Sequence, residues 1–335
     1  MPDAELLTFL CRLTAPFHTT RHIYRNLNRS GPEILGSSLR GMILSYLIQT
    51  NCEESRLAVL GEKRLPRDIQ AYHRACPEDC VVRDLAGESD WLPVFSFGVF
   101  DKFVPDLRYR VSMDRERRTV APGNLASVEV IPEGTAFRFS VVLTPAAFPW
   151  RQQFEQAVRD VGNWLGVGHY KSLGFGRFEV IEIKSYSVAS ELGRIRDEIR
   201  HLPKKFGLML STPLVLENGG VPMPLEGKAL GEAILGALRG RAAGVQSRFR
   251  LPERSNDDSA VVEECAFSFR PDYVSRDSFE QGTRKNALVA LAEGRLDVSF
   301  AGVMDLLPHQ LAVAQLFGVG PWADVGFGRL KPAFD

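Results

Sequence analysis

The chain has 335 residues, and its 41 basic and 41 acidic side chains give a formal net charge of zero. Hydrophobic residues make up 44% of the composition, which supplies enough apolar surface for folding and excludes general disorder. A balanced charge excludes a polycation but allows local basic surfaces, and the length predicts two domains.

The start of the chain and its cysteines indicate the compartment. The first ten residues, MPDAELLTFL, contain an acid and no basic segment before their short apolar stretch, so we expect no signal peptide. No apolar run approaches the roughly 20 residues that a membrane-spanning helix needs. The five cysteines, an odd number, do not indicate a disulfide framework. We therefore expect a cytoplasmic protein with no membrane partner.

The first half of the chain alternates between strand-like and helix-like patterns. Its predicted elements are a strand at 6–16, a helix at 37–48, a strand at 135–144, a helix at 150–165 and a strand at 177–186. An insertion at about 51–134 follows the first helix, and we expect it to hold a hairpin or subdomain around FSFGVFDKFVPDLRYRVSM. In outline this half has the ferredoxin-like order β-α-β-β-α-β.

The second half of the chain repeats this order. Its predicted elements are a strand at 205–216, a helix at 227–240, a strand at 294–303, a helix at 305–317 and a short strand at 329–332. Residues 187–204 predict a linking helix between the halves. The sequence therefore predicts the α+β class, with two tandem ferredoxin-like (RRM-like) domains at 1–190 and 204–335, the first of which carries the insertion.

A glycine-rich motif occurs once in each half, directly after the second predicted helix. The first glycine loop (166–178) reads GVGHYKSLGFGRF, and the second glycine loop (318–330) reads GVGPWADVGFGRL. Four glycines and one arginine match at a constant offset of 152 residues. Two loops of identical spacing in matching contexts indicate a duplicated unit.

The side chains of the two glycine loops predict different functions for the two loops. Glycine allows positive φ and a close approach of the backbone, so each loop could lie against a helix or a phosphate chain. A simple structural turn is the alternative for each loop. Each loop lies between a helix and a strand, the reverse of the order in phosphate-binding and dinucleotide-binding motifs, which excludes those sites. His169, Tyr170, Lys171 and Arg177 suit the first loop to phosphate contact. Trp322 and Asp324 instead suit the second loop to packing or base stacking.

These motifs resemble a known family. The second loop and the segment before it, GRLDVSFAGVMDLLPHQLAVAQLFGVG, look like the C-terminal domain of CRISPR pre-crRNA-processing endoribonucleases of the repeat-associated mysterious protein (RAMP) superfamily. GSSLRGMILSYL (36–47) resembles the entry to the first helix in that superfamily. The resemblance implies tandem ferredoxin-like domains that bind CRISPR repeat RNA and retain the 3′ stem-loop of the crRNA. It also implies cleavage without metal or cofactor, by attack of the 2′-hydroxyl on the adjacent phosphate.

Two other functions stay open. Related subunits of CRISPR effector complexes share these loops and bind crRNA without cutting it, so this chain could be a non-catalytic RAMP subunit with other effector subunits as partners. It could also be a ferredoxin-like RNA-binding protein outside CRISPR systems. The conventional aromatic strand motif of RRM domains is absent from the sequence, which weakens a standard single-strand RRM role.

The segment TAPFHTTRHIYRNLNRS, between the first strand and the first helix, is basic and contains no acid. RNA cleavage of this kind needs a general base, a general acid and a cation for the developing phosphorane charge. His22 is the first candidate for proton transfer, with Tyr24 nearby, and His18 is the second. Arg21 and Arg25 could hold phosphate, at a cleft between the domains where both glycine loops would clasp the RNA. Histidines that only line a surface loop are the alternative.

A second acid-free stretch, AILGALRGRAAGVQSRFRLP, could dock a repeat stem-loop, although a charge run is often only a solvated surface. Arg40, at the start of the first helix, could also reach phosphate or only face solvent. The complete set of candidate RNA-binding residues is Arg21, Arg25, Arg40, His169, Lys171, Arg177, Arg239, Arg241, Arg248 and Arg250.

Cys76 and Cys80 have a spacing that zinc sites use, and His73 lies just before them. Structural zinc sites need a second pair of ligands, which this segment lacks. We therefore expect no metal, while the spacing of the two cysteines leaves a zinc site open.

Overall fold

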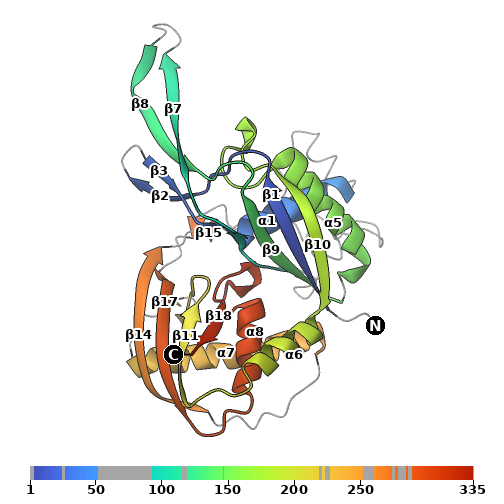
Figure 1. Ribbon diagram of the computed structural model, residues 1–335, viewed down its shortest axis with the longest axis vertical. Coiled ribbons are helices and arrows are strands. Elements are labelled where there is room, and N and C mark those ends of the chain that lie inside the picture. Colours follow the sequence, from blue (N-terminus) through green and yellow to red (C-terminus); the bar gives the residue numbers. More distant parts are fainter. Residues whose placement is uncertain are drawn as a thin grey trace.

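The computed structural model describes residues 4–24, 27–51, 93–114, 119–145, 147–218, 221–222, 227–251, 260–273, 276–277, 284–285 and 289–334. Two antiparallel sheets, each covered by helices, form the body of the protein (Figure 1). A third sheet extends from the N-terminal one as an arm. The predicted α+β class with antiparallel sheets is confirmed.

The N-terminal sheet has the strand order β10-β1-β9-β6-β4, with β5 also beside β9. Its strands are β1 (Glu5–Leu13), β4 (Glu33–Ile34), β5 (Val94–Phe95), β6 (Gly98–Phe100), β9 (Ala136–Leu143) and β10 (Phe178–Ser187). Helices α1 (Gly36–Asn51) and α5 (Arg151–Asp160) complete the unit, and α5 continues into a π-helical turn, η3 (Val161–Leu165). Taken along the chain, β1, α1, β5–β6, β9, α5 and β10 follow the ferredoxin-like order.

Alternation along β1 divides its side chains between two cores. Leu7, Phe9 and Cys11 are fully buried in the core beneath α1 and α5, because successive side chains of a strand point to opposite faces. Leu6 lies on the other face and joins the apolar core of the C-terminal half. Burial in the first core raises the pKa of the Cys11 thiol, which therefore stays protonated.

The C-terminal sheet has the order β14-β17-β11-β18, the same relative order as the N-terminal sheet. Its elements are β11 (Lys205–Leu210), α7 (Gly227–Phe249), β14 (Val261–Tyr273), β17 (Val289–Ala301), α8 (Leu307–Phe317) and β18 (Leu330–Ala333). Both halves therefore share one topology, as the repeated motif predicted. The domain boundaries at 190 and 204 stay a prediction.

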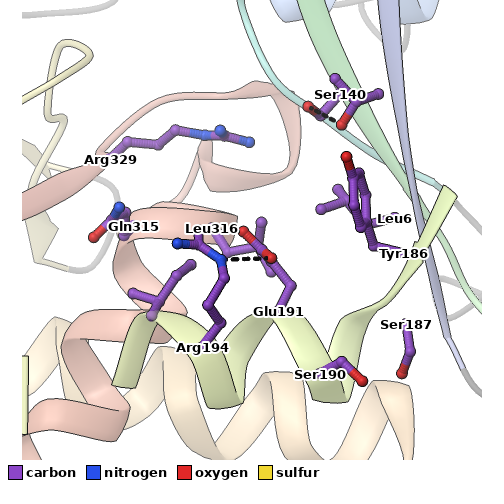
Figure 2. A pocket seen from close by; sticks show the side chains of 12 residues that line it. Leu6, Ser140, Tyr186, Ser187, Ser190, Glu191, Arg194, Gln315, Leu316 and Arg329 are labelled. Carbon is purple, nitrogen blue, oxygen red and sulfur yellow. Dashed lines mark hydrogen bonds and ion pairs between the residues drawn. The ribbon is translucent and has the colours of Figure 1, made fainter. Parts of the chain in front are cut away.

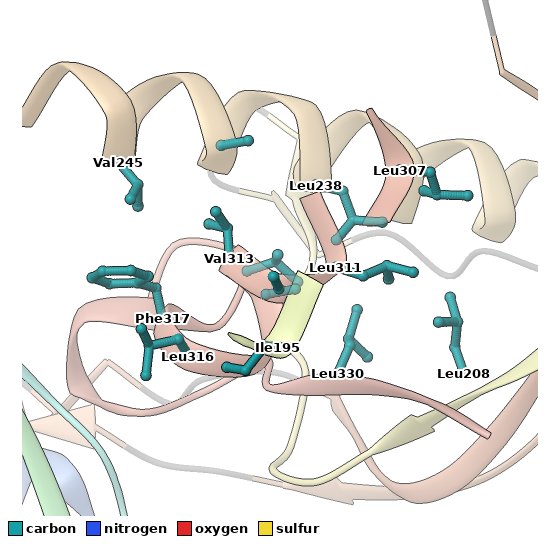
Figure 3. Packing of buried hydrophobic residues seen from close by; sticks show 14 of the residues in the cluster. Ile195, Leu208, Leu238, Val245, Leu307, Leu311, Val313, Leu316, Phe317 and Leu330 are labelled. Atoms are coloured by element: carbon teal, nitrogen blue, oxygen red, sulfur yellow. The ribbon is translucent and has the colours of Figure 1, made fainter. Parts of the chain in front are cut away.

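The predicted linking helix is α6 (Val188–Glu198), which follows β10 directly. Its apolar side chains Val188, Leu192 and Ile195 are buried with those of α7 and α8. Figure 3 shows Ile195 close to Leu311 and Leu316 of α8. Since Leu6, Val94 and Val142 of the N-terminal sheet belong to the same cluster, the two halves share a continuous apolar core.

The predicted insertion contributes strands both to the N-terminal sheet and to the arm. Strands β5 and β6 fall inside it but belong to the N-terminal sheet, so residues 51–134 are not one continuous insertion. The expected hairpin is present as β7 (Asp106–Asp114) and β8 (Thr119–Val130), which pair with β2 (Thr20–Tyr24) and β3 (Leu27–Ser30) to form the arm (Figure 1). Short pairs complete the described strands: β12 (Glu217–Asn218) with β13 (Val221–Pro222), and β15 (Arg276–Asp277) with β16 (Arg284–Lys285).

Cys76 and Cys80 lie outside the described residues, so their prediction stays untested. Across the part of the chain that is described, no three His, Cys, Asp or Glu side chains gather as metal ligands would. Within the same part, no helix combines the length and apolar character required to cross a bilayer.

Each glycine loop depends on positive backbone φ angles at all four glycines. These are 71, 86, 82 and 74° in the first loop and 72, 87, 92 and 70° in the second. At Gly176 a Cβ atom would lie 1.8 Å from the carbonyl oxygen of Val167, whereas at Gly174 it would meet no described atom within 4 Å. The two positions therefore separate the effect of backbone angle from the effect of close approach.

We expect Gly174→Ala to lower the free energy of unfolding by about 1–2 kcal/mol, the cost of a Cβ in the left-handed region. Gly176→Ala should cost about 2 kcal/mol more, because the Val167 peptide must also move. Equilibrium unfolding in urea would measure both losses. Equal losses would contradict the close approach of the two backbone segments.

Candidate nucleic-acid interface

The two glycine loops are held by the same backbone hydrogen bonds. In the first loop, the Val167 N–H donates to Gly176 O (2.9 Å) and the Gly176 N–H donates to Pro16 O (2.8 Å). In the second loop, the corresponding bonds run from Val319 to Gly328 (3.0 Å) and from Gly328 to Pro213 (2.8 Å). These corresponding hydrogen bonds show that the two loops have equivalent backbone structures. The loops therefore differ in their side chains and in the residues around them.

The second loop is buried between the two halves. Val325 and Phe327 form an apolar cluster with Phe97 and Val215, and the Phe97 and Phe327 rings meet edge to face at 4.9 Å. A Cβ at Gly36, the first residue of α1, would lie 2.4 Å from Val325 O, so the loop touches the helix backbone. The expected packing role of this loop is confirmed. The expectation that both loops hold an RNA strand in a cleft between the domains is wrong, because apolar side chains fill the interface at the second loop.

Asp324 of the second loop binds two arginines of α7. Its carboxylate oxygens accept hydrogen bonds from Arg241 Nη2 and Arg248 Nη1, each at 2.7 Å. Only 18% of the Arg241 side chain and 12% of the Arg248 side chain are exposed. Burial raises the pKa of Asp324, but attraction to the two guanidinium groups outweighs it and holds the pKa below its usual value.

The predicted arginine surface on α7 is therefore wrong as a continuous patch. Arg241 and Arg248 point into the fold, where Asp324 neutralises them. Arg239 is half-buried and donates to the carbonyl oxygen of Ala260 at 2.7 Å. Arg250, just after the helix, is the one exposed residue of this predicted group of four. The sequence showed the positive charges of this segment. Asp324, the acid that pairs with them, lies 83 residues after Arg241 and 76 residues after Arg248.

The first loop presents its polar side chains to solvent. His169, Lys171 and Arg177 are exposed, and Tyr170 is half-buried. Lys171 Nζ lies 2.7 Å from Met42 Sδ of α1, and partial burial lowers the pKa of this lysine. The first loop therefore brings together an imidazole, a phenol and two cations, as its sequence predicted.

His18 is fully buried beneath the first loop and has no surface with which to contact a substrate. Its predicted role as a catalytic residue is therefore wrong. Its ring stacks on Tyr170 with centroids 5.3 Å apart, and His169 lies at 6.0 Å. Since a carbonyl oxygen only accepts, His18 Nδ1 carries a proton and donates it to Glu129 O at 2.7 Å. His18 O also accepts a hydrogen bond from the His169 N–H at 2.8 Å. His18 thus supports the exposed histidine.

Tyr170 adopts the left-handed conformation, with φ of 60°, which is uncommon for a residue other than glycine. Its ring is fixed by His18 on one side and contacts Phe175 with centroids 5.9 Å apart. Asn28 Nδ2 of β3 lies 3.4 Å from the tyrosine hydroxyl, which connects the loop to the arm. The sequence indicates Tyr170 only as one of the phosphate-contact groups of the first loop, and no sequence signal shows that its ring packs on His18.

The other predicted residues lie around this loop or outside the described part. The backbone of His22 and Tyr24 belongs to β2, paired in register with Arg29 and Leu27 of β3. Arg21 is also in β2, whereas Arg25 lies outside the described residues. Arg40 is half-buried on α1, between Gly36 at the second loop and Met42 at the first.

Comparison with known proteins identifies one family. A family model described as the RAMP superfamily matches residues 11–179, just over half of the chain, and this span includes the first glycine loop. No curated protein matches the chain.

Two solved structures are similar at low identity. A Cas6 product complex is 12% identical, with a TM-score of 0.46, and the match covers 99% of this chain and 100% of that one. A chain of the Type III-B Cmr-beta complex bound to cognate target RNA is 16% identical, with a TM-score of 0.37, and the match covers 55% of this chain and 61% of that one. Both TM-scores lie below 0.5, so the family assignment rests on the family model.

Proposed function

This chain belongs to the RAMP superfamily, and from that premise we propose that it is an endoribonuclease that cuts CRISPR repeat RNA. The proposed cut is independent of metal: the 2′-hydroxyl attacks the adjacent phosphate and leaves a 2′,3′-cyclic phosphate. The product would stay bound through its 3′ stem-loop. The partner of the chain is then repeat RNA, with other effector subunits as further partners.

The contrast between the two equivalent loops carries this proposal. The second loop has Pro321 where the first has His169, and Ala323 where the first has Lys171. It is buried in the seam, and its one acid neutralises two arginines. The first loop instead keeps the same rigid backbone and exposes groups that can move protons and bind phosphate. A turn with only a structural role needs none of those side chains.

Each group of the first loop has a proposed role. His169 can exchange a proton with the 2′-hydroxyl or the leaving 5′-oxygen, since imidazole titrates near neutral pH. Lys171 and Arg177 can neutralise the charge that develops on the phosphate. Tyr170 and His18 position the loop and are not placed at the reacting atoms. His22 and Tyr24 remain proposed catalytic residues on the neighbouring strand β2.

The experiment that tests this function is cleavage of a repeat transcript by the purified chain in excess EDTA. We expect a product that ends in a 2′,3′-cyclic phosphate and no cleavage of a transcript with a single 2′-deoxy substitution at the cut site. This deoxy substrate should bind as tightly as the natural one, because only the nucleophile is lost. Tight binding of both RNAs without any cleavage would support the non-catalytic subunit instead.

A further inference from the structure

A cleft of about 810 Å³ lies between the two halves, apart from the first glycine loop. It is lined by Thr8 and Ser140 of the N-terminal sheet, by Tyr186 at the end of β10, by Arg194 of α6 and by Gln315 of α8. Figure 2 shows Arg329, near the end of the second loop, extending into this space from the side opposite Ser140. Its volume is within the range of cavities that bind small molecules, about 300–1,000 Å³.

Arg329 is the unusual group of this cleft. Its Nε is buried, and no acceptor in the described residues lies within hydrogen-bonding distance of it. The backbone on either side is fixed: the Arg329 N–H donates to Thr212 Oγ1 at 2.9 Å, and Arg329 O accepts from the Ser211 N–H at 2.8 Å. A buried donor without a partner costs free energy, so a cleft that retains one is suited to an acceptor from outside.

The other charges of the cleft do not neutralise Arg329. The acid that lines it, Glu191, forms an ion pair with Arg194 at 2.6 Å, and Arg194 also pairs with Glu198. Burial lowers the pKa of Arg329 to about 10, which still leaves the guanidinium charged at neutral pH. One positive charge therefore remains uncompensated among the described residues that line the cleft.

We propose that this cleft binds the phosphate group of a nucleotide through Arg329. The Thr8 and Ser140 hydroxyls, 3.3 Å apart, and the Gln315 amide supply further hydrogen-bonding groups in the same cavity. Tyr186 adds an aromatic surface, of the kind on which bases stack. This site is separate from the first glycine loop and does not depend on cleavage. The phosphate belongs either to a free nucleotide or to the backbone of a bound RNA.

The test is isothermal titration of the full chain with inorganic phosphate, adenosine 5′-monophosphate and a 2′-deoxy-substituted repeat RNA, with adenosine as the ligand that lacks phosphate. Arg329→Met should weaken phosphate binding about tenfold to a hundredfold, the effect of losing a charged hydrogen bond. Arg329→Lys keeps the charge and should restore part of the affinity. The matched control is Arg138→Met, which removes an exposed arginine of β9.

Stability measurements separate binding from folding. Arg329→Met should melt no lower than the wild type, because it removes an unpartnered buried charge. Gln315→Glu leaves Arg329 in place but adds an acid to the cleft, and should also weaken phosphate binding. Titration with inorganic phosphate involves neither RNA nor cleavage, so failure of the proposed nuclease site and failure of this site are distinguishable.

Tight binding of adenosine 5′-monophosphate would assign a free nucleotide as the ligand. Binding of the RNA alone, weakened by Arg329→Met, would assign a backbone phosphate. The proposal is overturned if the wild type binds none of the three phosphate ligands, or if Arg329→Met binds them as tightly as the wild type.

Discussion

Replacing His169 by alanine is expected to slow repeat-RNA cleavage by about two to four orders of magnitude, the usual contribution of a general acid or base. The imidazole is exposed in a loop whose backbone is fixed, so its loss should remove proton transfer without disturbing the fold. RNA affinity should change little, because Lys171 and Arg177 remain. Single-turnover cleavage and equilibrium binding of the same RNA measure the two effects.

His201 provides the matched control for His169. It is also exposed, follows α6, and contacts Arg200, with Nη2 and Nε2 3.1 Å apart. His201→Ala should therefore cleave at the wild-type rate. If His169→Ala also cleaves at that rate, the first loop does not supply the proton-transfer group. His22 would then become the leading candidate, and His22→Ala the next variant to measure.

Replacing Asp324 by asparagine is expected to lower the free energy of unfolding by about 3 kcal/mol. The change leaves Arg241 and Arg248 as buried charges without a counterion, and breaking a buried pair in this way typically costs about 3–5 kcal/mol. We take the lower end because 34% of the Asp324 side chain is exposed. Asp101→Asn is the control, since Asp101 pairs with Arg138 at 3.6 Å on the exposed surface and should cost under about 1 kcal/mol.

The effect of Asp324 should also depend on pH. Because its pKa is lower in the folded chain than in the unfolded one, Asp324 stabilises the fold above its unfolded pKa of about 3.9. That contribution is lost as the pH falls through the folded value. The difference in stability between the wild type and Asp324→Asn should therefore shrink below about pH 4. A difference that stays constant down to pH 2 would contradict the ion pairs.

The repeated glycine motif predicted much of the fold. An offset of 152 residues identified equivalent loops, and the alternating patterns before and after them placed β9, β10, α8 and β17 near their observed positions. Periodicity sufficed here because one face of each element is buried in a core. Periodicity did not predict β5 and β6, because these strands are too short to show an alternating hydrophobic pattern. Both also lie within the long segment that the sequence predicts as an insertion.

The candidate site was harder to predict from the sequence. Contacts with residues far away in the sequence decide which of its side chains are buried and which are exposed. His18 and His22 look alike in an acid-free segment, yet His18 is buried under Tyr170, 152 residues later. The arginines of α7 looked like a free surface for the same reason. By contrast, His169 and Lys171 are exposed, since a glycine loop outside the core has few ways to bury them, and their contact with phosphate stays a prediction.

The burial of the second glycine loop has a consequence for synthesis of the chain. Gly36 and Phe97, which this loop covers, are translated long before residues 318–330. Until those residues leave the ribosome, the nascent chain exposes to water an apolar surface that its own later segment covers in the folded protein. The N-terminal half therefore reaches its final packing only after the C-terminal half has been made, and chaperones that hold nascent chains have an interval in which to act.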